Sequence, residues 1–161
     1  MKLKVPFFKQ DTPYTCGPVT LQMAFDFFGV FEGEKQLARE AHTDHETGTK
    51  PKWMIDVAEK KGFYCHEETE ATLDDVCYFL EKKLPVIIYF IEPSEDESHY
   101  SIVTGVERST VTLNDPWNGE GYKILESEFL ERWHCKCGHR VRWLMVISRE
   151  PIVFEKTTEM K

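Results

Sequence analysis

The sequence has little of what several large classes of protein require. It has 20 lysines and arginines against 28 acidic residues, a formal net charge of -8 over 161 residues. A chain this short of positive charge is a poor partner for nucleic acid, because phosphate binding needs a concentrated basic surface. Its longest apolar run, residues 84–91, is far below the roughly 20 residues that a membrane span needs. We therefore expect neither a nucleic-acid partner nor a membrane span.

Cysteine is sparse as well, and the chain has no evident internal repeat or interdomain linker. The five cysteines are an odd number, and the uncharged residues 5–8 are too short for a signal peptide. This pattern favours reduced thiols and a cytoplasmic location over a framework of disulfides. With 41% hydrophobic and 30% charged residues, we expect one folded domain over residues 1–150 and a tail over residues 151–161.

Helical patterns dominate the first half of the chain and strand patterns the second. Apolar residues at helical spacing predict helices over residues 19–28, 34–42, 51–61 and 73–80, the last capped by Thr72 and Asp75. A short helix over residues 128–133, capped by Ser127, is expected before the last strand. This order predicts an α+β fold in which N-terminal helices pack on a mainly antiparallel C-terminal sheet. The strands are predicted from β-branched and aromatic runs at residues 86–91, 99–106, 110–113, 122–125 and 141–147.

The segment around Cys16 carries the first functional signal. Cys16-Gly17-Pro18 stands directly before an apolar helix, and proline is favoured in the first helical turn. The first N–H groups of a helix have no internal partner, so they and the helix dipole favour a thiolate. The same donors could bind the oxyanion formed when that thiolate attacks a carbonyl, and Gln10 could add a side-chain N–H. Cys16 is thus a candidate nucleophile, although a single cysteine at a helix start is more often structural.

A cysteine nucleophile also needs a base, and the base needs a group that orients it. Among the six histidines, His99 opens a strong strand pattern directly after an acidic loop, where a scaffold can present a side chain into a cleft. Asp115 follows the next short strand and could reach a ring nitrogen of His99 from the neighbouring strand. Each residue alone is a weak signal, and the pattern of all three is the stronger one.

Taken in order, these residues resemble the C39-like cysteine peptidases, which are relatives in fold of the papain group. The similarity runs over residues 5–147, and the ordered set of motifs is more specific than any single one. It is carried by Gln10, Cys16-Gly17-Pro18 with Leu21, Met23 and Gly29, Gly48-Thr49, the strand from His99 to Gly105, Asn114-Asp115-Pro116 with Gly119, and Ser127, Glu128, Phe129 and Trp133.

The resemblance implies a papain-like fold and a peptidase or related amide hydrolase with a Cys-His-Asp triad. Cys16 would be the nucleophile, His99 the general base and then acid, and Asp115 the group that orients the imidazole. Gln10 would be an oxyanion donor beside the Cys16 backbone N–H. A peptide or protein substrate would acylate Cys16, and water would then hydrolyse the thioester, with no metal or organic cofactor.

The substrate stays open at this point. The best-known members of the family precede peptide exporters and cut leader peptides after two glycines, whereas this chain contains no transporter and resembles a stand-alone domain. A catalytically idle relative that binds a peptide in the same groove is the main alternative.

Residues 134–139 hold a separate group of potential soft-metal ligands: His134, Cys135, Cys137 and His139. The Cys-x-Cys spacing is tighter than the usual spacing of zinc ligands, so we expect a turn with exposed thiols. Zinc shared with Cys65 and His66, a metal that bridges two chains, or a redox role of Cys135 and Cys137 are the alternatives.

The loop directly before His99 is strongly acidic, with Glu92, Glu95, Asp96 and Glu97. A solvated loop is the simpler interpretation. The functional alternative is a lip over the cleft that attracts basic residues of a substrate and favours the protonated form of His99.

Overall fold

The computed structural model describes residues 2–138 and 140–156 and alternates helical and strand segments. Three helices come first: α1 (Cys16–Phe27), α2 (Glu34–Glu40) and α3 (Pro51–Lys60). Strand β1 (Tyr64–Glu68) and helix α4 (Leu73–Glu81) follow. The second half contains β2 (Val86–Ile91), β3 (Ser98–Glu107), β4 (Thr110–Asp115), β5 (Gly119–Leu125), α5 (Glu126–Arg132) and β6 (Leu144–Ser148).

Six strands of the described residues form one sheet in the order β1-β6-β2-β3-β4-β5, and every pair is antiparallel. This confirms the predicted α+β class and antiparallel sheet. The sequence patterns miss β1, because two of its five residues are glutamates and none is β-branched. It forms at the sheet edge by pairing with β6, with Cys65 opposite Ile147.

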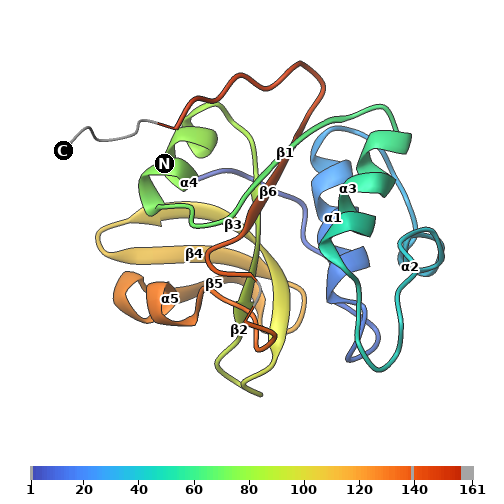
Figure 1. Ribbon diagram of the computed structural model, residues 1–161, viewed down its shortest axis with the longest axis horizontal. Coiled ribbons are helices and arrows are strands. Elements are labelled where there is room, and N and C mark those ends of the chain that lie inside the picture. Colours follow the sequence, from blue (N-terminus) through green and yellow to red (C-terminus); the bar gives the residue numbers. More distant parts are fainter. Residues whose placement is uncertain (1, 139, 157–161) are drawn as a thin grey trace.

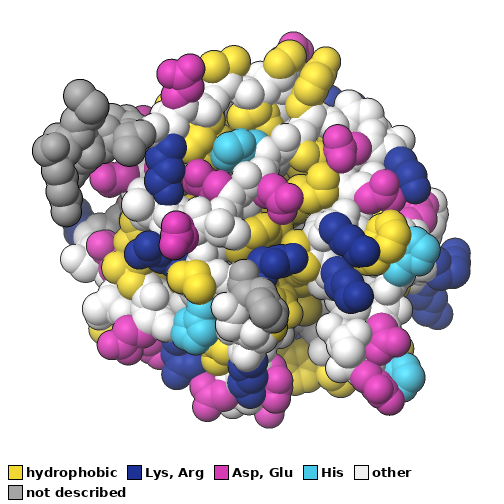
Figure 2. Space-filling view, viewed as in Figure 1, with side chains coloured by type: hydrophobic (Ala, Val, Ile, Leu, Met, Phe, Trp, Pro, Cys, Tyr) yellow, Lys and Arg dark blue, Asp and Glu magenta, His cyan; other side chains and the backbone are white. Residues whose placement is uncertain are grey.

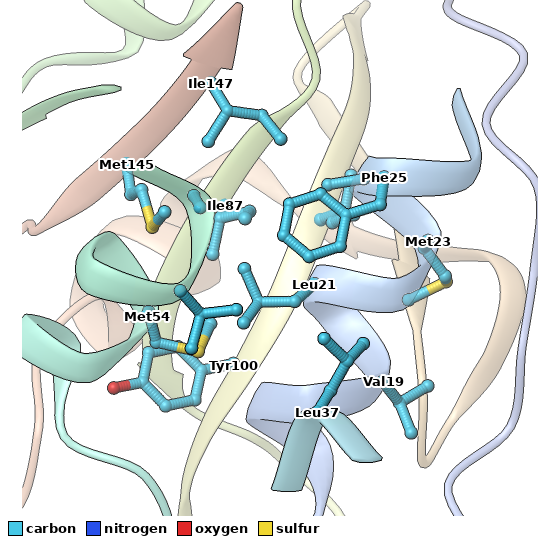
Figure 3. Packing of buried hydrophobic residues seen from close by; sticks show 14 of the residues in the cluster. Val19, Leu21, Met23, Phe25, Leu37, Met54, Ile87, Tyr100, Met145 and Ile147 are labelled. Carbon is cyan, nitrogen blue, oxygen red and sulfur yellow. The ribbon is translucent and has the colours of Figure 1, made fainter. Parts of the chain in front are cut away.

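The alternation of side chains along the strands divides the core into two clusters. Ile87, Ile102 and Met145 face α1, α2 and α3, and Figure 3 shows this cluster from close by. Their neighbours Ile88 and Val103 belong to the second cluster, with α4 and α5. Figure 1 shows α1–α3 on one side of the sheet and α4 and α5 on the other. The prediction that N-terminal helices pack together on the sheet is therefore correct for α1–α3. Helix α4 packs on the opposite face.

Helix α1 begins at Cys16, three residues before the predicted start, and α2 ends at Glu40, two residues before the predicted end, whereas α3 and α4 agree with the predictions to within one residue. The Thr72 side chain accepts a hydrogen bond from the Asp75 backbone N–H at 3.1 Å, and the Asp75 side chain accepts from Thr72 N at 3.0 Å, which confirms the capping pair. The predicted cap of α5 is wrong: the N-cap is Leu125, and Ser127 lies inside the first turn. Strand β6 begins later than predicted, because Val141 forms an isolated bridge with His134 in the preceding turn.

The N-terminal segment leads to α1 without regular secondary structure and is tied to the end of β4. The Asn114 side chain donates to Val5 O at 2.8 Å, and Gln10 N donates to Pro116 O at 3.0 Å. These bonds place Gln10 beside the residues that follow β4, and Figure 1 shows the dark-blue segment running across to α1.

Residues 151–156, the described part of the expected tail, pack on the second core cluster. Ile152 and Phe154 contact that cluster, and the Phe154 ring lies 4.9 Å from Phe79. Lys156 Nζ donates to Glu70 O at 2.6 Å. On the face shown in Figure 2, acidic and basic side chains are interspersed. A search of the described helices finds none long and apolar enough to cross a membrane.

Candidate active site

Cys16 is the first residue of α1 and is 8% exposed. The Thr15 hydroxyl does not cap the helix, because it donates to the Glu34 carboxylate at 2.7 Å. The first turn contains no acidic residue, and none of the described residues accepts a hydrogen bond from the Cys16 backbone N–H. The start of α1 is therefore open to an anion, with the positive end of the helix dipole behind it.

Gly17 allows the loop before α3 to approach the start of α1. A Cβ at this position would lie 2.8 Å from Thr49 Oγ1 and 2.9 Å from Thr49 Cβ, too close for any other residue. Thr49 O in turn accepts a hydrogen bond from the Tyr100 hydroxyl at 2.7 Å. This contact joins α1, the loop and β3, and gives a physical reason for Gly48-Thr49 accompanying Cys16-Gly17-Pro18.

His99 and Asp115 lie on neighbouring strands, β3 and the end of β4, as their spacing predicts. His99 Nε2 lies 2.9 Å from Asp115 Oδ1, and the side chains are 7% and 0% exposed. Asp115 Oδ1 also accepts from the backbone N–H groups of Trp117 at 2.9 Å and Asn118 at 2.8 Å. The turn after β4 thus fixes the carboxylate that holds the imidazole.

Charge governs the protonation of this pair. Burial lowers the pKa of His99, but the negative charges of Cys16 and Asp115, and hydrogen bonds to both, outweigh burial and raise that pKa to about 10. Burial raises the pKa of Asp115, but the His99 charge and the hydrogen bonds to the carboxylate bring it below its usual value. An imidazolium and a carboxylate are therefore favoured at neutral pH. Because Asp115 takes Nε2, the ring nitrogen left for Cys16 is Nδ1.

Gln10 lines the same cavity as His99 and is 5% exposed. Its Nε2 donates to Thr12 O at 2.6 Å, which leaves the second N–H of that nitrogen available. Its Oε1 is buried without a hydrogen-bond partner among the described residues.

Two neighbouring cavities bring three of the four predicted site residues, Gln10, Cys16 and His99, around one cleft, and Asp115 is buried behind His99. The first, which we call the His99 cavity, has a volume of about 310 Å³. The second, the Cys16 cavity, has a volume of about 500 Å³ and includes Thr49, Tyr89, Tyr100 and Lys136. The His99 cavity is lined by Gln10, Pro13, Glu92, Glu95, Glu97, Ser98, His99 and Trp117. The two cavities share Pro13, Glu97 and Ser98, so they are parts of one cleft.

Sequence reasoning misses three of the residues in this cleft. Trp117 directly follows Asp115-Pro116, and Tyr89 alternates with buried residues of β2. Lys136 stands between two cysteines that point to other chemistry. Of the three, only Trp117 could have been predicted from the sequence. It comes just after the orienting carboxylate, and the turns at strand ends often line a cleft.

The segment 134–138 differs from the expected turn with exposed thiols. Cys135 and Cys137 form a disulfide, and Cys135 is buried. The expectation that all cysteines are reduced thiols is thus wrong for this pair, while Cys16, Cys65 and Cys77 are free. Lys136 N donates to Ser98 Oγ at 2.9 Å, which joins the segment to the cleft.

The candidate metal ligands of this segment, which the sequence offered only as an alternative to a turn, do not gather into a site in the described part of the chain. His139 lies outside the described residues, and His134 pairs through its backbone with Val141. No group of three or more His, Cys, Asp or Glu side chains able to hold a metal ion occurs among the described residues.

Comparisons with known proteins find relatives in sequence and in fold. An uncharacterised protein of Methanothermobacter marburgensis is 29% identical over 111 residues, which are 69% of this chain and 71% of that protein. The transport/processing ATP-binding protein ComA of Streptococcus pneumoniae is 28% identical over 121 residues, 73% of this chain but 16% of ComA. This chain therefore matches only a small part of that transporter.

Solved structures share the fold over nearly the whole chain. The peptidase domain of Streptococcus ComA superposes with a TM-score of 0.71 at 19% identity, covering 91% of this chain and 98% of that domain. A C39-like peptidase from Bacillus anthracis gives 0.70 at 16% identity, covering 92% and 98%. A double glycine motif protease from an AMS/PCAT transporter, in complex with the leader peptide, gives 0.69 at 19% identity, covering 91% and 92%. Residues 4–137 match the Peptidase C39 family, and the chain belongs to that family.

Proposed function

We propose that this protein is a cysteine peptidase that cleaves an amide bond of a peptide through a thioester on Cys16. The observation that carries the proposal is the buried His99–Asp115 pair, 2.9 Å apart, beside a cysteine at an open helix N-terminus whose charge raises the pKa of His99. Membership of the Peptidase C39 family supports the reaction class. A relative in complex with its leader peptide supports a peptide as the substrate.

The first step is acylation of Cys16. The thiolate attacks the scissile carbonyl carbon, and the electron pair of the C=O bond moves to oxygen. In this proposal the Cys16 backbone N–H and the second N–H of Gln10 Nε2 donate to that oxyanion. Collapse of the intermediate breaks the C–N bond, and His99 Nδ1 gives its proton to the leaving amine.

The second step returns the enzyme to its starting state. His99, now neutral, takes a proton from water as the water oxygen attacks the thioester carbonyl. The C–S bond then breaks, which releases the carboxylic acid and restores the thiolate and imidazolium. Asp115 keeps its charge throughout and holds Nε2–H, so that Nδ1 faces the reacting atoms in both steps.

The test is the rate at which each cysteine reacts with a mild alkylating agent. With iodoacetamide near neutral pH, we expect mass spectrometry to detect alkylation of Cys16 before that of Cys65 or Cys77, whose thiol pKa values are raised by burial, for Cys65 to about 12. His99→Ala should slow alkylation of Cys16 and leave that of Cys77 unchanged. Equal rates at Cys16 and Cys77 in the wild type would contradict the proposal.

Turnover separates the peptidase from an idle relative that binds a peptide in the same groove. A peptidase should form an acyl adduct on Cys16 that is visible by mass spectrometry after rapid acid quenching of a peptide mixture. An idle relative should bind peptide without any adduct, and that result would overturn the proposed reaction even if Cys16 were reactive.

A further inference from the structure

The two cavities beside the triad receive different parts of a substrate in the proposed reaction. His99 must give its proton to the leaving nitrogen, so the fragment that follows the scissile bond lies on the His99 side. The His99 cavity contains His99 and Gln10 but not Cys16. The Cys16 cavity contains the nucleophile and is therefore the place of the acyl fragment.

The charged groups of the His99 cavity are acidic, apart from His99 itself. Three glutamates line it, and the described residues place no lysine or arginine in its wall. Glu92 is buried and already occupied: its oxygens accept from Glu95 N at 2.7 Å and from Ser94 N at 2.7 Å. Glu92 therefore holds the loop in place and is not free for a ligand.

Glu95 and Glu97 are the carboxylates available to a ligand. The Glu95 carboxylate has no hydrogen bond or ion pair with the described residues, and its side chain is exposed. Glu97 lies 3.5 Å from Lys136 Nζ, but both side chains are more than half exposed, so water weakens this pair. A cation of the substrate can therefore bind Glu97 together with Lys136 or in its place.

The other walls of the cavity also suit a donor or a cation. Trp117 is 39% exposed, and the face of an indole ring attracts a cation within about 6 Å. Gln10 lines the cavity and is only 5% exposed. Its Oε1 has no hydrogen-bond partner among the described residues. A buried acceptor without a donor costs free energy, so the bound state gains if the ligand supplies an N–H.

We propose that the His99 cavity is a subsite for a lysine or arginine residue directly after the scissile bond. This inference rests on the proposed function, since the reaction assigns the cavity to the leaving fragment. The cationic head of that residue lies between Glu95, Glu97 and the ring of Trp117. The substrate class is therefore a peptide whose cleavage releases a fragment with a basic N-terminal residue.

Asp96 supplies a matched control in the same loop. It has the same charge as Glu95, and its side chain is 69% exposed. However, Asp96 Oδ1 pairs with Arg132 Nη1 at 2.9 Å, and Asp96 does not line the cavity. Asp96→Asn changes the net charge by the same amount as Glu95→Gln. An effect of long-range charge alone would appear equally in both variants.

Binding can be measured without catalysis in the Cys16→Ala protein. Lysinamide represents the leaving fragment, and norleucinamide has the same apolar stem without the charged head. We expect lysinamide to shift the Trp117 indole N–H signal in NMR spectra, assigned with Trp117→Phe, and norleucinamide to bind more weakly. Glu95→Gln alone should weaken lysinamide binding, adding Glu97→Gln should bring the loss to about three- to tenfold, and Asp96→Asn should not weaken it. Equal binding of the two amides, no shift with either, or an equal loss in Asp96→Asn would overturn the subsite.

Cleavage specificity gives a second readout. Peptides from a proteome cut after glutamate keep lysine and arginine in internal positions, and new amino termini can be identified by mass spectrometry. We expect basic residues to be enriched at the new termini for the wild type and Asp96→Asn, and the enrichment to be lost in the double glutamine variant. Cleavage without enrichment overturns the subsite and leaves the peptidase intact. If the wild type gives no more new termini than Cys16→Ala, the result counts against the peptidase. The lysinamide binding experiment then still decides whether the subsite exists.

Discussion

Two places in this chain combine a cysteine, a histidine and a carboxylate, and their arrangements are opposite. In the candidate active site, Cys16 and His99 come from distant parts of the sequence, yet the charge of Cys16 raises the pKa of His99, and Asp115 holds the imidazole from behind. On β1, Cys65 and His66 are neighbours in sequence and therefore point to opposite faces of the sheet. Cys65 packs against the first core cluster, whereas the His66 ring lies 5.3 Å from that of Phe79 in the second.

The surroundings of the two histidines separate them further. Burial lowers the pKa of His66, and the negative charges of Asp75 and Glu67 do not offset this. Burial also lowers the pKa of His99, but the charges of Cys16 and Asp115 reverse the shift. The comparison teaches that a cysteine, a histidine and a carboxylate close together in sequence do not by themselves make a catalytic site. The charge of the histidine depends on negative groups brought to it from other helices and strands.

Replacing each cysteine should give the largest contrast between the two places. Cys16→Ala removes the nucleophile, so we expect kcat/KM on a cleaved peptide to fall by about 10⁴-fold or more. Cys65→Ala should leave kcat/KM unchanged, because the Cys65 thiol is buried and has a pKa of about 12. Both values can be measured on one fluorogenic peptide, with circular dichroism as a check of folding. A comparable loss in Cys65→Ala would remove the distinction.

Neutralising each carboxylate should give the next contrast. An asparagine at position 115 can still accept from His99 Nε2, so we expect Asp115→Asn to lower kcat about 10- to 100-fold. The charge of Asp115 helps to raise the pKa of His99, and activity is lost as pH rises through that pKa. The alkaline limb of the pH–rate profile should therefore move to lower pH in Asp115→Asn. Glu68→Gln should leave the profile in place, and an unmoved limb in Asp115→Asn would show that the charge has no such part.

The sequence predicts the triad because its signals are local. A cysteine before a Gly-Pro helix start, a histidine that opens a strand and an aspartate after the next strand are each readable from a few residues. Pairing of adjacent antiparallel strands then brings His99 and Asp115 together, with Ile102 opposite Asn114. Only the joint pattern is informative, which is why the family resemblance carries the assignment.

What the sequence does not predict depends on contacts between distant segments. Strand β1 has weak strand propensity and forms because β6 pairs with it. Ser127 is a good capping residue by type, but α5 begins one residue earlier at Glu126, directly after β5, which leaves Ser127 inside the helix. In the acidic loop, Asp96 is paired with Arg132, whereas Glu95 and Glu97 line the cleft. The local sequence does not show which of these carboxylates is paired, because Arg132 lies far away in the chain.

The aromatic cover of His66 gives a prediction on stability. The Phe154 ring lies 5.2 Å from the His66 ring and 4.9 Å from that of Phe79, so residues 151–156 shield this histidine. Phe154→Ala should lower the free energy of unfolding by about 2 kcal/mol, since a partly buried aromatic side chain is lost. Urea denaturation measures the change, and kcat/KM should stay the same because the cleft is elsewhere. A loss of activity at unchanged stability would link the two places.

Glu68 and Asp115 should affect stability with opposite dependence on pH. Burial, and then the charge of Asp75, raise the pKa of Glu68 to about 7, so its contribution is present below the unfolded value near 4.5 and is lost as pH rises through about 7. The pKa of Asp115 is lowered, so its contribution is present above the unfolded value near 3.8 and is lost as pH falls through the folded value. Relative to the wild type, Glu68→Gln should therefore gain about 1 kcal/mol between pH 5 and 8, because the variant has no carboxylate to ionise there. His66 titrates in both proteins and cancels in this difference, which urea denaturation at a series of pH values measures. A difference that is flat with pH would mean that Glu68 is as well solvated as a surface carboxylate, and the two places would then differ in geometry alone.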